Sequence, residues 1–194
     1  GFTVAPLTAE FGWSRTEIIL PATIYGLIAS LMAPVFGWLA DRHGVRKVAL
    51  WSVFAFALAL AAVALTPTAN KTSTLYFYYG LWTVIGLVGI GSTPVTWSRA
   101  VNLWFFRHRG LALGILLMGT SVAALVIPKL AVWAIAEFGW RMMFALMALL
   151  PLLVALPVAW LYFREPRPEE RPPALVLRDG RLAGMTLGEA LRGY

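Results

Sequence analysis

The chain contains two long runs without a charged side chain, separated only by a short charged turn. One run extends from Ile18 to Ala40 and the other from Val48 to Thr66. A helix needs about 20 mostly apolar residues to cross the hydrocarbon core of a bilayer. Both runs are apolar on every side of a helix, whereas a soluble bundle has helices that are apolar on one face only. These runs therefore predict an all-α integral membrane protein, with the lipid bilayer as its first partner.

The composition supports this prediction and argues against several functions. Hydrophobic residues make up 60% of the chain and charged residues only 13%, well below the charged share of soluble domains. The net charge is +7, but the basic residues lie in turns and in the tail, so we expect no nucleic-acid partner. The absence of cysteine excludes a disulfide or a thiolate metal site. The spans contain no catalytic triad, paired carboxylates or phosphate loop, so we expect neither an enzyme nor a cofactor.

The pattern of apolar runs and turns predicts five complete membrane helices and the end of a sixth. Residues 1–9 are too short to span a bilayer, and we interpret them as the end of a truncated first helix. Ser14 and Glu17 have the spacing of a capping box that opens the next helix, with Pro21 in its first turn. The complete spans are predicted at residues 18–40, 48–66, 75–97, 110–131 and 142–163. Residues 164–194 are rich in proline and charge and are predicted to form a linker.

The distribution of basic residues predicts the orientation of these spans. The turns on one side carry Arg42, Arg46, Lys47, Arg99, Arg107, Arg109, Arg164 and Arg167. The turns on the other side carry Arg15, Lys71 and Arg141, with Lys129 near the edge. Because basic residues accumulate in cytoplasmic loops, the first side is predicted to be cytoplasmic. We expect a multi-pass protein of the inner or plasma membrane with a cytoplasmic linker at residues 164–194.

The charged turn has a distinctive pattern, Gly37-Trp-Leu-Ala-Asp-Arg-His-Gly-Val-Arg-Lys47. It resembles the signature loop between the second and third spans of major facilitator superfamily transporters. The resemblance implies the N-terminal six-helix bundle of a twelve-helix fold, whose missing C-terminal bundle would be a partner within the same polypeptide. It also implies alternating access, with a conformational-switch loop formed by Gly37, Asp41, Arg42, Gly44, Arg46 and Lys47. In that scheme Asp41 caps a helix of the missing bundle, and Arg46 and Lys47 form ion pairs that break when the bundles separate.

Three further stretches resemble one branch of that superfamily, the monocarboxylate and oxalate–formate porters. They are Phe11–Glu17, Trp104–Gly114 and Gly139–Arg141, and Met185–Arg192 looks like the segment that precedes a seventh span. This resemblance implies secondary transport of a small, monocarboxylate-like organic anion by symport or antiport. It leaves open whether transport is coupled to protons. No acidic residue lies inside a predicted complete span, so a proton-carrying carboxylate is expected outside them. The tripeptide Phe-Gly-Trp occurs twice, at residues 11–13 and 138–140, and both copies are predicted on the side opposite the cytoplasm. We call this short internal repeat the echo.

The spans also contain candidate residues for a substrate path. Tyr79, Thr83, Gly86, Thr93 and Trp97 recur at helical intervals in the span predicted at 75–97, so they are expected on one face. Arg99 and Lys129 are candidate contacts for an anion. The alternatives are helix–helix hydrogen bonding for the hydroxyls and snorkelling of the two cations toward the headgroups.

Small residues mark a predicted contact between helices. Gly110 and Gly114, with Gly119 beyond, are expected to form a packing face on the span at 110–131. Two alternatives to the half-transporter remain open at this point. One is a six-helix membrane protein that acts as a dimeric carrier or scaffold, and the other is a facilitator for a different substrate class.

Overall fold

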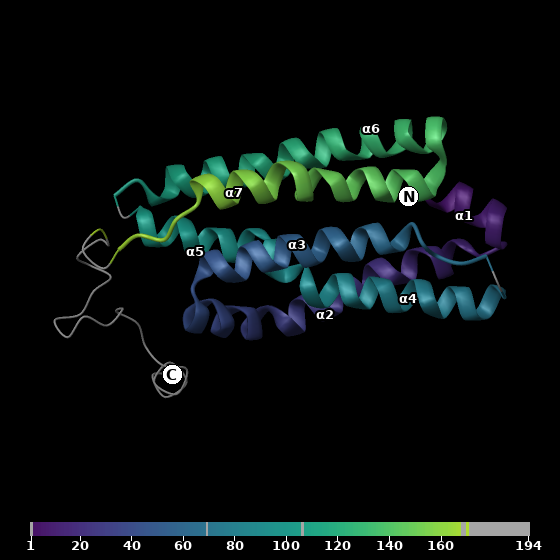
Figure 1. The fold of residues 1–194 in the computed structure, drawn as a ribbon, viewed down its shortest axis with the longest axis horizontal. Helices are drawn as coiled ribbons and strands as arrows, with labels where there is room; N and C mark the ends of the chain where they lie inside the picture. The colour runs from purple at the N-terminus through teal and green to yellow at the C-terminus, as the bar shows by residue number, and fades with distance from the viewer. Residues whose placement is uncertain (1, 69, 106, 168–169, 171–194) are drawn as a thin grey trace.

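The computed structural model describes residues 2–68, 70–105, 107–167 and 170, and these residues form helices and turns without a strand (Figure 1). Three long helical layers run roughly parallel to the long axis of the molecule, with α6 and α7 on one side and α2 and α4 on the other. The elements are α1 (Val4–Phe11), α2 (Arg15–His43), α3 (Val45–Val63), α4 (Lys71–Val88), the 3₁₀-helix η1 (Ile90–Ser92), α5 (Pro94–Trp104), α6 (Arg109–Leu150), the π-helix η2 (Pro151–Ala155) and α7 (Leu156–Tyr162).

The start of α2 confirms the capping box expected from the sequence. The backbone N–H of Glu17 donates to the Ser14 hydroxyl at 3.3 Å, and the Ser14 N–H donates to the Glu17 carboxylate at 2.7 Å. The sequence predicted that Pro21 lies in the first turn of this helix. This prediction is wrong, because the helix begins at Arg15 and Pro21 lies inside it. Proline has no N–H, and the carbonyl of the residue four positions earlier, Glu17, therefore loses its helical donor. The hydroxyl of Tyr79 donates to this carbonyl at 3.0 Å.

The span predicted at residues 75–97 is not one continuous helix. Helix α4 ends at Val88, η1 follows, and α5 begins at Pro94 and continues to Trp104. Thr93 is extended, with φ −78° and ψ 162°, because the ring of the following proline disfavours the helical region for the residue before it. The helix axis is therefore interrupted between the outer and the inner parts of this segment.

Helix α6 contains a reversal of the chain at Gly139. This residue has φ 80° and ψ 168°, which a side chain would strain, and the ribbon turns back there so that α7 runs beside the first part of α6 (Figure 1). The turn expected at Phe138–Arg141 is thus present. The helices before and after Gly139 overlap the ranges 110–131 and 142–163 that were expected as separate spans.

Close contacts between helices occur at glycines of the α4–η1 segment. A Cβ atom on Gly86 would lie 3.2 Å from the Cβ of Ile28, so α2 and α4 approach closely there. A Cβ on Gly91 would collide with the side chain of Ser52 on α3. The absence of a side chain at these two positions lets η1 and the end of α4 lie against their neighbours.

The packing face expected at Gly110, Gly114 and Gly119 is not used by the described helices. All three glycines are exposed, and a Cβ atom added to any of them meets no other atom within 4 Å. The small residues were placed correctly on a helix, but the described part of the chain provides no helix to cover them. Sequence periodicity can find such a face, whereas the partner depends on tertiary contacts that periodicity does not contain.

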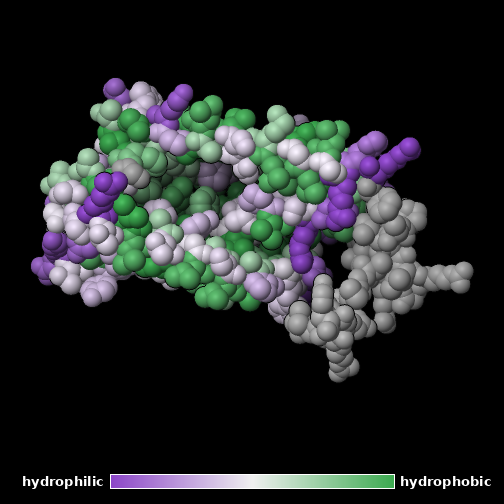
Figure 2. Space-filling model, turned by 180° about the vertical axis from the view of Figure 1, so that it is seen from behind, coloured by the Kyte–Doolittle hydropathy of each residue, from purple (hydrophilic) through white to green (hydrophobic). Residues whose placement is uncertain are grey.

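Buried side chains form two clusters at opposite ends of the bundle. The larger cluster includes Leu7, Trp13, Tyr78 and Met143, and the smaller one surrounds Val48 beside the charged turn. The space-filling view shows apolar side chains over the middle of the molecule and hydrophilic ones toward both ends (Figure 2). Within the described residues, three helical segments are long and apolar enough to cross a membrane. They are Arg15–His43, Val45–Val63 and Arg109–Tyr162, the last of which contains the reversal at Gly139.

Candidate functional site

An ion pair joins the end of α2 to α5 at the charged turn. Asp41 lies in the last turn of α2, and its Oδ1 is 2.6 Å from Nη1 of Arg99. The same nitrogen donates to the backbone carbonyl of Gly37 at 2.7 Å. A Cβ on Gly37 would lie 3.1 Å from Nη2 of Arg99, so the missing side chain lets the guanidinium rest against α2. The carboxylate of Asp41 remains 70% exposed, and solvent therefore screens this pair.

A second carboxylate, that of Glu165, caps the next helix. Gly44 separates α2 from α3 with φ 91°, a conformation that side chains rarely adopt. Oε1 of Glu165 accepts the backbone N–H of Arg46 in the first turn of α3 at 2.7 Å. A carboxylate is favourable at this position because the first N–H groups of a helix have no helical acceptor. A Cβ on Gly44 would lie only 2.7 Å from that Oε1 atom.

The side chain of Arg46 extends the same connection to the end of the last helix. Its Nη2 donates to the carbonyl of Trp160 at 2.7 Å, and a cation is favourable near the last carbonyls of a helix such as α7. Nearby, the indole N–H of Trp104 donates to the carbonyl of Arg164 at 3.1 Å, and the Arg164 guanidinium lies 4.7 Å from the Trp104 ring centre. The residues that follow α7 are therefore bound to both α3 and α5.

These contacts surround a hollow of about 270 Å³ at the junction of α2, α3 and α5. Asp41, Gly44, Arg99, Asn102 and Glu165 are among the residues that line it. The site combines two carboxylates with one guanidinium that α5 supplies. No group of three or more histidine and acidic residues that could hold a metal ion occurs in the described ranges. The arrangement can hold helices together by charge, and it can release them if either carboxylate finds another partner.

The structure places the six residues of the expected switch loop as follows. Arg99 forms an ion pair with Asp41 and donates a hydrogen bond to the carbonyl of Gly37. Glu165 accepts the backbone N–H of Arg46 and packs against Gly44. Arg42 lies over the ring of Trp38, 5.3 Å from its centre, and Lys47 is exposed. At this turn Asp41 thus pairs with a cation, and Glu165 is the acid that caps α3.

Sequence reasoning missed the role of Glu165. An acid between Arg164 and Pro166, directly after an apolar span, was a usable signal, because the chain has only 9 acidic residues. The sequence alone did not show that this residue lies beside a turn 119 positions earlier.

The candidate path residues make contacts within the bundle. The hydroxyl of Thr83 donates to the carbonyl of Tyr79 at 2.9 Å, and that of Thr93 donates to the carbonyl of Ile90 at 2.7 Å. The ring of Trp97 lies 5.1 Å from that of Phe163. Because the helix breaks between α4 and α5, these residues do not form one continuous face. Lys129 is exposed on α6, and Arg99 is engaged by Asp41.

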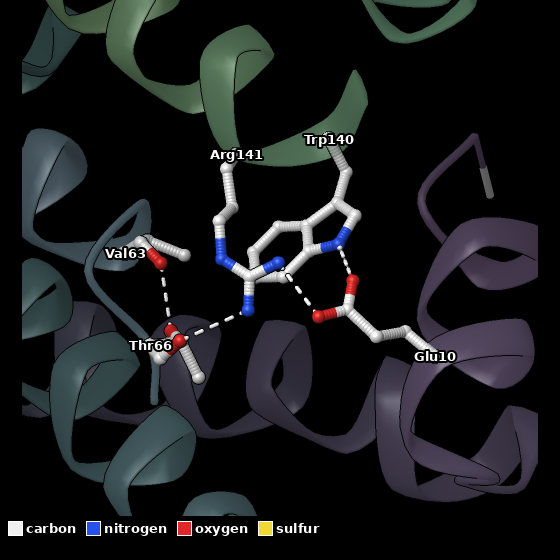
Figure 3. Close-up of polar contacts among 5 residues, drawn as sticks. All are labelled: Glu10, Val63, Thr66, Trp140 and Arg141. Carbon is white, nitrogen blue, oxygen red and sulfur yellow. Dashed lines mark hydrogen bonds and ion pairs between the residues drawn. The ribbon is translucent and has the colours of Figure 1, made fainter. Parts of the chain in front are cut away.

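A second polar cluster lies at the opposite end of the bundle (Figure 3). The two carboxylate oxygens of Glu10 accept hydrogen bonds from the Trp140 indole and from Arg141, both at 2.6 Å. Arg141 also donates to the carbonyl of Thr66 at 3.2 Å. Burial raises the pKa of Glu10, but the bonds from Trp140 and Arg141 and the guanidinium charge outweigh it and hold the pKa below its usual value. This cluster, the Glu10 clamp, joins the end of α1, the loop after α3 and the turn at Gly139.

The short internal echo of the sequence meets at this clamp. Phe11 stacks on Trp13 with ring centres 4.4 Å apart and contacts Trp140 edge-on at 5.9 Å. The glycines of the two echo segments both have positive φ angles, 63° and 80°. The two similar turns therefore pack against each other in the larger core.

A bundle of long apolar helices, with its charged contacts confined to turns at the two ends, defines a multi-pass integral membrane protein. The family model described as Major Facilitator Superfamily matches residues 1–188, and the chain belongs to this family.

Curated relatives share about a quarter to a third of the aligned residues. The chain is similar to the cis,cis-muconate transport protein of Acinetobacter baylyi, with 26% identity over 82% of this chain and 39% of that protein. It is similar to the galacturonate transporter of Dickeya chrysanthemi, with 30% identity over 82% of this chain and 44% of that protein. It is also similar to the hexuronate transporter of Escherichia coli K12, with 29% identity over 84% of this chain and 36% of that protein. The chain thus spans less than half the length of these relatives.

Proposed function

We propose that this chain is the N-terminal bundle of a secondary transporter that moves a small organic anion across a membrane by alternating access. The family match over residues 1–188 carries this proposal. The relatives span more than twice the matched length, which supports a second bundle in the same polypeptide. Residues 1–163 then form the N-terminal bundle, and residues 164–194 form a cytoplasmic linker to the second bundle. The basic turns support a cytoplasmic position for the Asp41 end of the bundle.

The substrate class is a carboxylate. Muconate, galacturonate and hexuronates, the compounds in the names of three relatives, all carry at least one carboxylate group. Within this class we propose a monocarboxylate-like anion, which is supported by the stretches that resemble the monocarboxylate and oxalate–formate branch. Asp41 is the only acid between Glu17 and Glu137, and it lies in a turn. If protons drive transport, the carboxylate that carries them is supplied by a part of the protein outside these spans.

The charged turn is proposed to act as a latch in this cycle. Asp41 holds α5 through Arg99, and its largely exposed carboxylate remains accessible to another partner. A helix N-terminus of the second bundle would be such a partner, because its unpaired N–H groups attract a carboxylate. Arg42, Arg46 and Lys47 supply cations on the same side. Exchange of Asp41 between Arg99 and the second bundle would couple the position of α5 to bundle closure.

A second candidate substrate class is supported by other relatives. The chain is 29% identical to the multidrug resistance protein B homolog of Mycobacterium tuberculosis over 86% of this chain and 29% of that protein. A drug carrier would move amphipathic, commonly cationic compounds and would respond to no simple carboxylate.

Uptake by vesicles that contain the full-length protein distinguishes these classes. The panel consists of radiolabelled formate, oxalate, lactate, pyruvate, galacturonate and muconate, with and without a proton gradient, and a cationic dye represents drugs. Saturable uptake of one carboxylate that the others inhibit is the expected result. Dye transport together with no carboxylate uptake would contradict the anion proposal and favour the drug carrier. Empty vesicles measure leakage.

A further inference from the structure

An apolar groove opens between α2, α3 and the end of α4, beside the charged turn. It encloses about 430 Å³. Phe36 of α2, Trp51 and Ala55 of α3 and Leu87 of α4 contribute to its walls. Trp51 is 70% exposed, so the groove is open to the surroundings of the bundle. Because α2 and α3 are long and apolar enough to cross a membrane, the open side of the groove lies along helices of membrane-spanning length.

The groove has a cationic mouth at the end nearest the charged turn. His43 and Lys47 line this end, and both side chains are exposed. On α3, Lys47, Trp51 and Ala55 follow one another at intervals of four residues and so share one helix face. The rise from Lys47 to Ala55 is about 12 Å at 1.5 Å per residue. On α2, His43 lies two turns from Phe36 on the same face. Both helices therefore change from apolar to polar along the groove in the same direction, and Lys47 supplies the positive charge.

No carboxylate opposes the ammonium group of Lys47 among the described residues that line the groove. The acids nearest in the fold have other partners: Asp41 pairs with Arg99, and Glu165 accepts the N–H of Arg46. The mouth therefore carries uncompensated positive charge at the depth where an apolar helix meets the polar headgroups. Tryptophan is favoured at this depth, and Trp51 lies one helical turn from Lys47.

We propose that this groove binds one phospholipid with an anionic headgroup. The phosphate and the headgroup contact Lys47 and His43, and an acyl chain lies along Trp51 toward Phe36 and Ala55. Charge complementarity selects an anion, and the apolar length behind the cations selects a ligand that carries a hydrocarbon chain. A soluble phosphate compound uses only the mouth, and a soluble protein cannot reach walls that face lipid. The proposal depends on membrane insertion and not on the transported substrate.

Native mass spectrometry of the full-length protein in detergent tests this proposal. Phosphatidylglycerol, phosphatidylcholine of the same chains and glycerol phosphate are each titrated against the parent protein. We expect the first bound phosphatidylglycerol to have a Kd severalfold below that of phosphatidylcholine, and glycerol phosphate not to compete. The double variant Lys47→Gln/His43→Gln should abolish the preference for phosphatidylglycerol. The variant Ala55→Phe, which fills the groove, should weaken the binding of both lipids.

The matched control is Arg42→Gln, which removes one positive charge from the same turn but not from the groove, and it should keep the preference. An unchanged preference in the double variant would overturn the proposal, as would equal competition by glycerol phosphate, which indicates a soluble phosphate site. Equal loss in Arg42→Gln would show that only the net charge of the turn matters. Melting temperatures without added lipid show whether each variant is folded. If the double variant does not fold, the lipid preference of Lys47→Gln alone and the lipid binding of Ala55→Phe test the proposal instead.

Discussion

The hydroxyl of Tyr79 donates to the backbone carbonyl of Glu17 at 3.0 Å, and that carbonyl is the one that Pro21 leaves without a helical donor. A residue of α4 thus completes the hydrogen bonding of α2 at the position where proline interrupts it. In a membrane segment an unsatisfied carbonyl is costly because lipid cannot replace the donor. Tyr79 therefore has a structural task that is independent of any substrate.

Removal of this hydroxyl should destabilise the bundle. We expect Tyr79→Phe to lower the free energy of unfolding by about 1–2 kcal/mol, measured as a lower melting temperature of the full-length protein in detergent. The matched control is Tyr76→Phe, because the Tyr76 side chain is exposed. In a Pro21→Ala background the restored N–H satisfies Glu17, so Tyr79→Phe should cost less there. Equal costs in both backgrounds would contradict this explanation.

The pair of Asp41 and Arg99 should affect transport more than stability. Because the pair is exposed, Asp41→Asn should change the free energy of unfolding by about 1 kcal/mol or less. If the turn is a latch, the same change should lower uptake severalfold while the protein still inserts into the membrane. The measurement is initial uptake at equal amounts of inserted protein. Uptake equal to that of the parent would show that the loop only determines topology.

Two substitutions test the cap that Glu165 places on α3. Glu165→Ala should destabilise the protein by about 1 kcal/mol, as the loss of an N-terminal cap usually does. Gly44→Ala should cost more, because its Cβ would meet the Glu165 carboxylate and its φ angle is positive. Such strain typically costs about 1–3 kcal/mol. In the double variant the collision disappears, and the backbone strain and the loss of the cap remain, so its cost should be below the sum of the two single costs. Additive melting shifts would contradict the contact.

The Glu10 clamp predicts a dependence of stability on pH. The folded state lowers the pKa of Glu10 below its ordinary value of 4.5, so the ionised carboxylate is favoured in the fold. The clamp is fully stabilising above that ordinary value, and its contribution is lost as the pH falls through the lower pKa of the folded state. Melting temperatures measured from pH 6 downward, with about pH 3 as the lower limit, should decline less in Glu10→Gln than in the parent.

A second pair, Arg164 and Glu170, should contribute to the same dependence. The hydrogen bond and charge of Arg164, with the N–H of Arg167, lower the pKa of Glu170 to about 2. In this pH range the unfolded state takes up a proton on Glu170 while the folded state does not, so Glu170→Gln should also reduce the decline, and the double variant Glu10→Gln/Glu170→Gln should decline least. Identical slopes in the parent and in Glu10→Gln would contradict the role of the clamp.

The two sets of glycines predict different responses to a larger side chain. Gly86→Leu should lower the melting temperature clearly, because the position faces Ile28 at close distance. Gly114→Leu is the matched control, since open space surrounds that position among the described helices. A similar decrease in both variants would show that Gly114 packs against a part of the protein beyond these helices. A decrease in Gly114→Leu alone would contradict the close contact at Gly86.

The membrane class, the family and the turns were predictable from local features of the sequence. The uncharged run from Ile18 to Ala40 required a long apolar helix, and Ser14 with Glu17 marked its start. Proline disfavours the helical region for the residue before it, so the break before Pro94 has a local cause, whereas helical intervals alone placed Tyr79 and Trp97 on one face. Pairings such as Glu165 with Arg46 were not predictable, because they join residues more than a hundred positions apart through tertiary packing. Local periodicity contains no information about such distances.

The contacts of Arg46 also determine where mechanical load enters the bundle. Its backbone holds Glu165 and its side chain holds Trp160, so the polypeptide that leaves α7 is tied to the first turn of α3. A pull on the chain from beyond this point reaches the turn between α2 and α3 before it can reach α7. The residues after the last helix therefore act as a tether to the one turn where the two carboxylates meet the bundle.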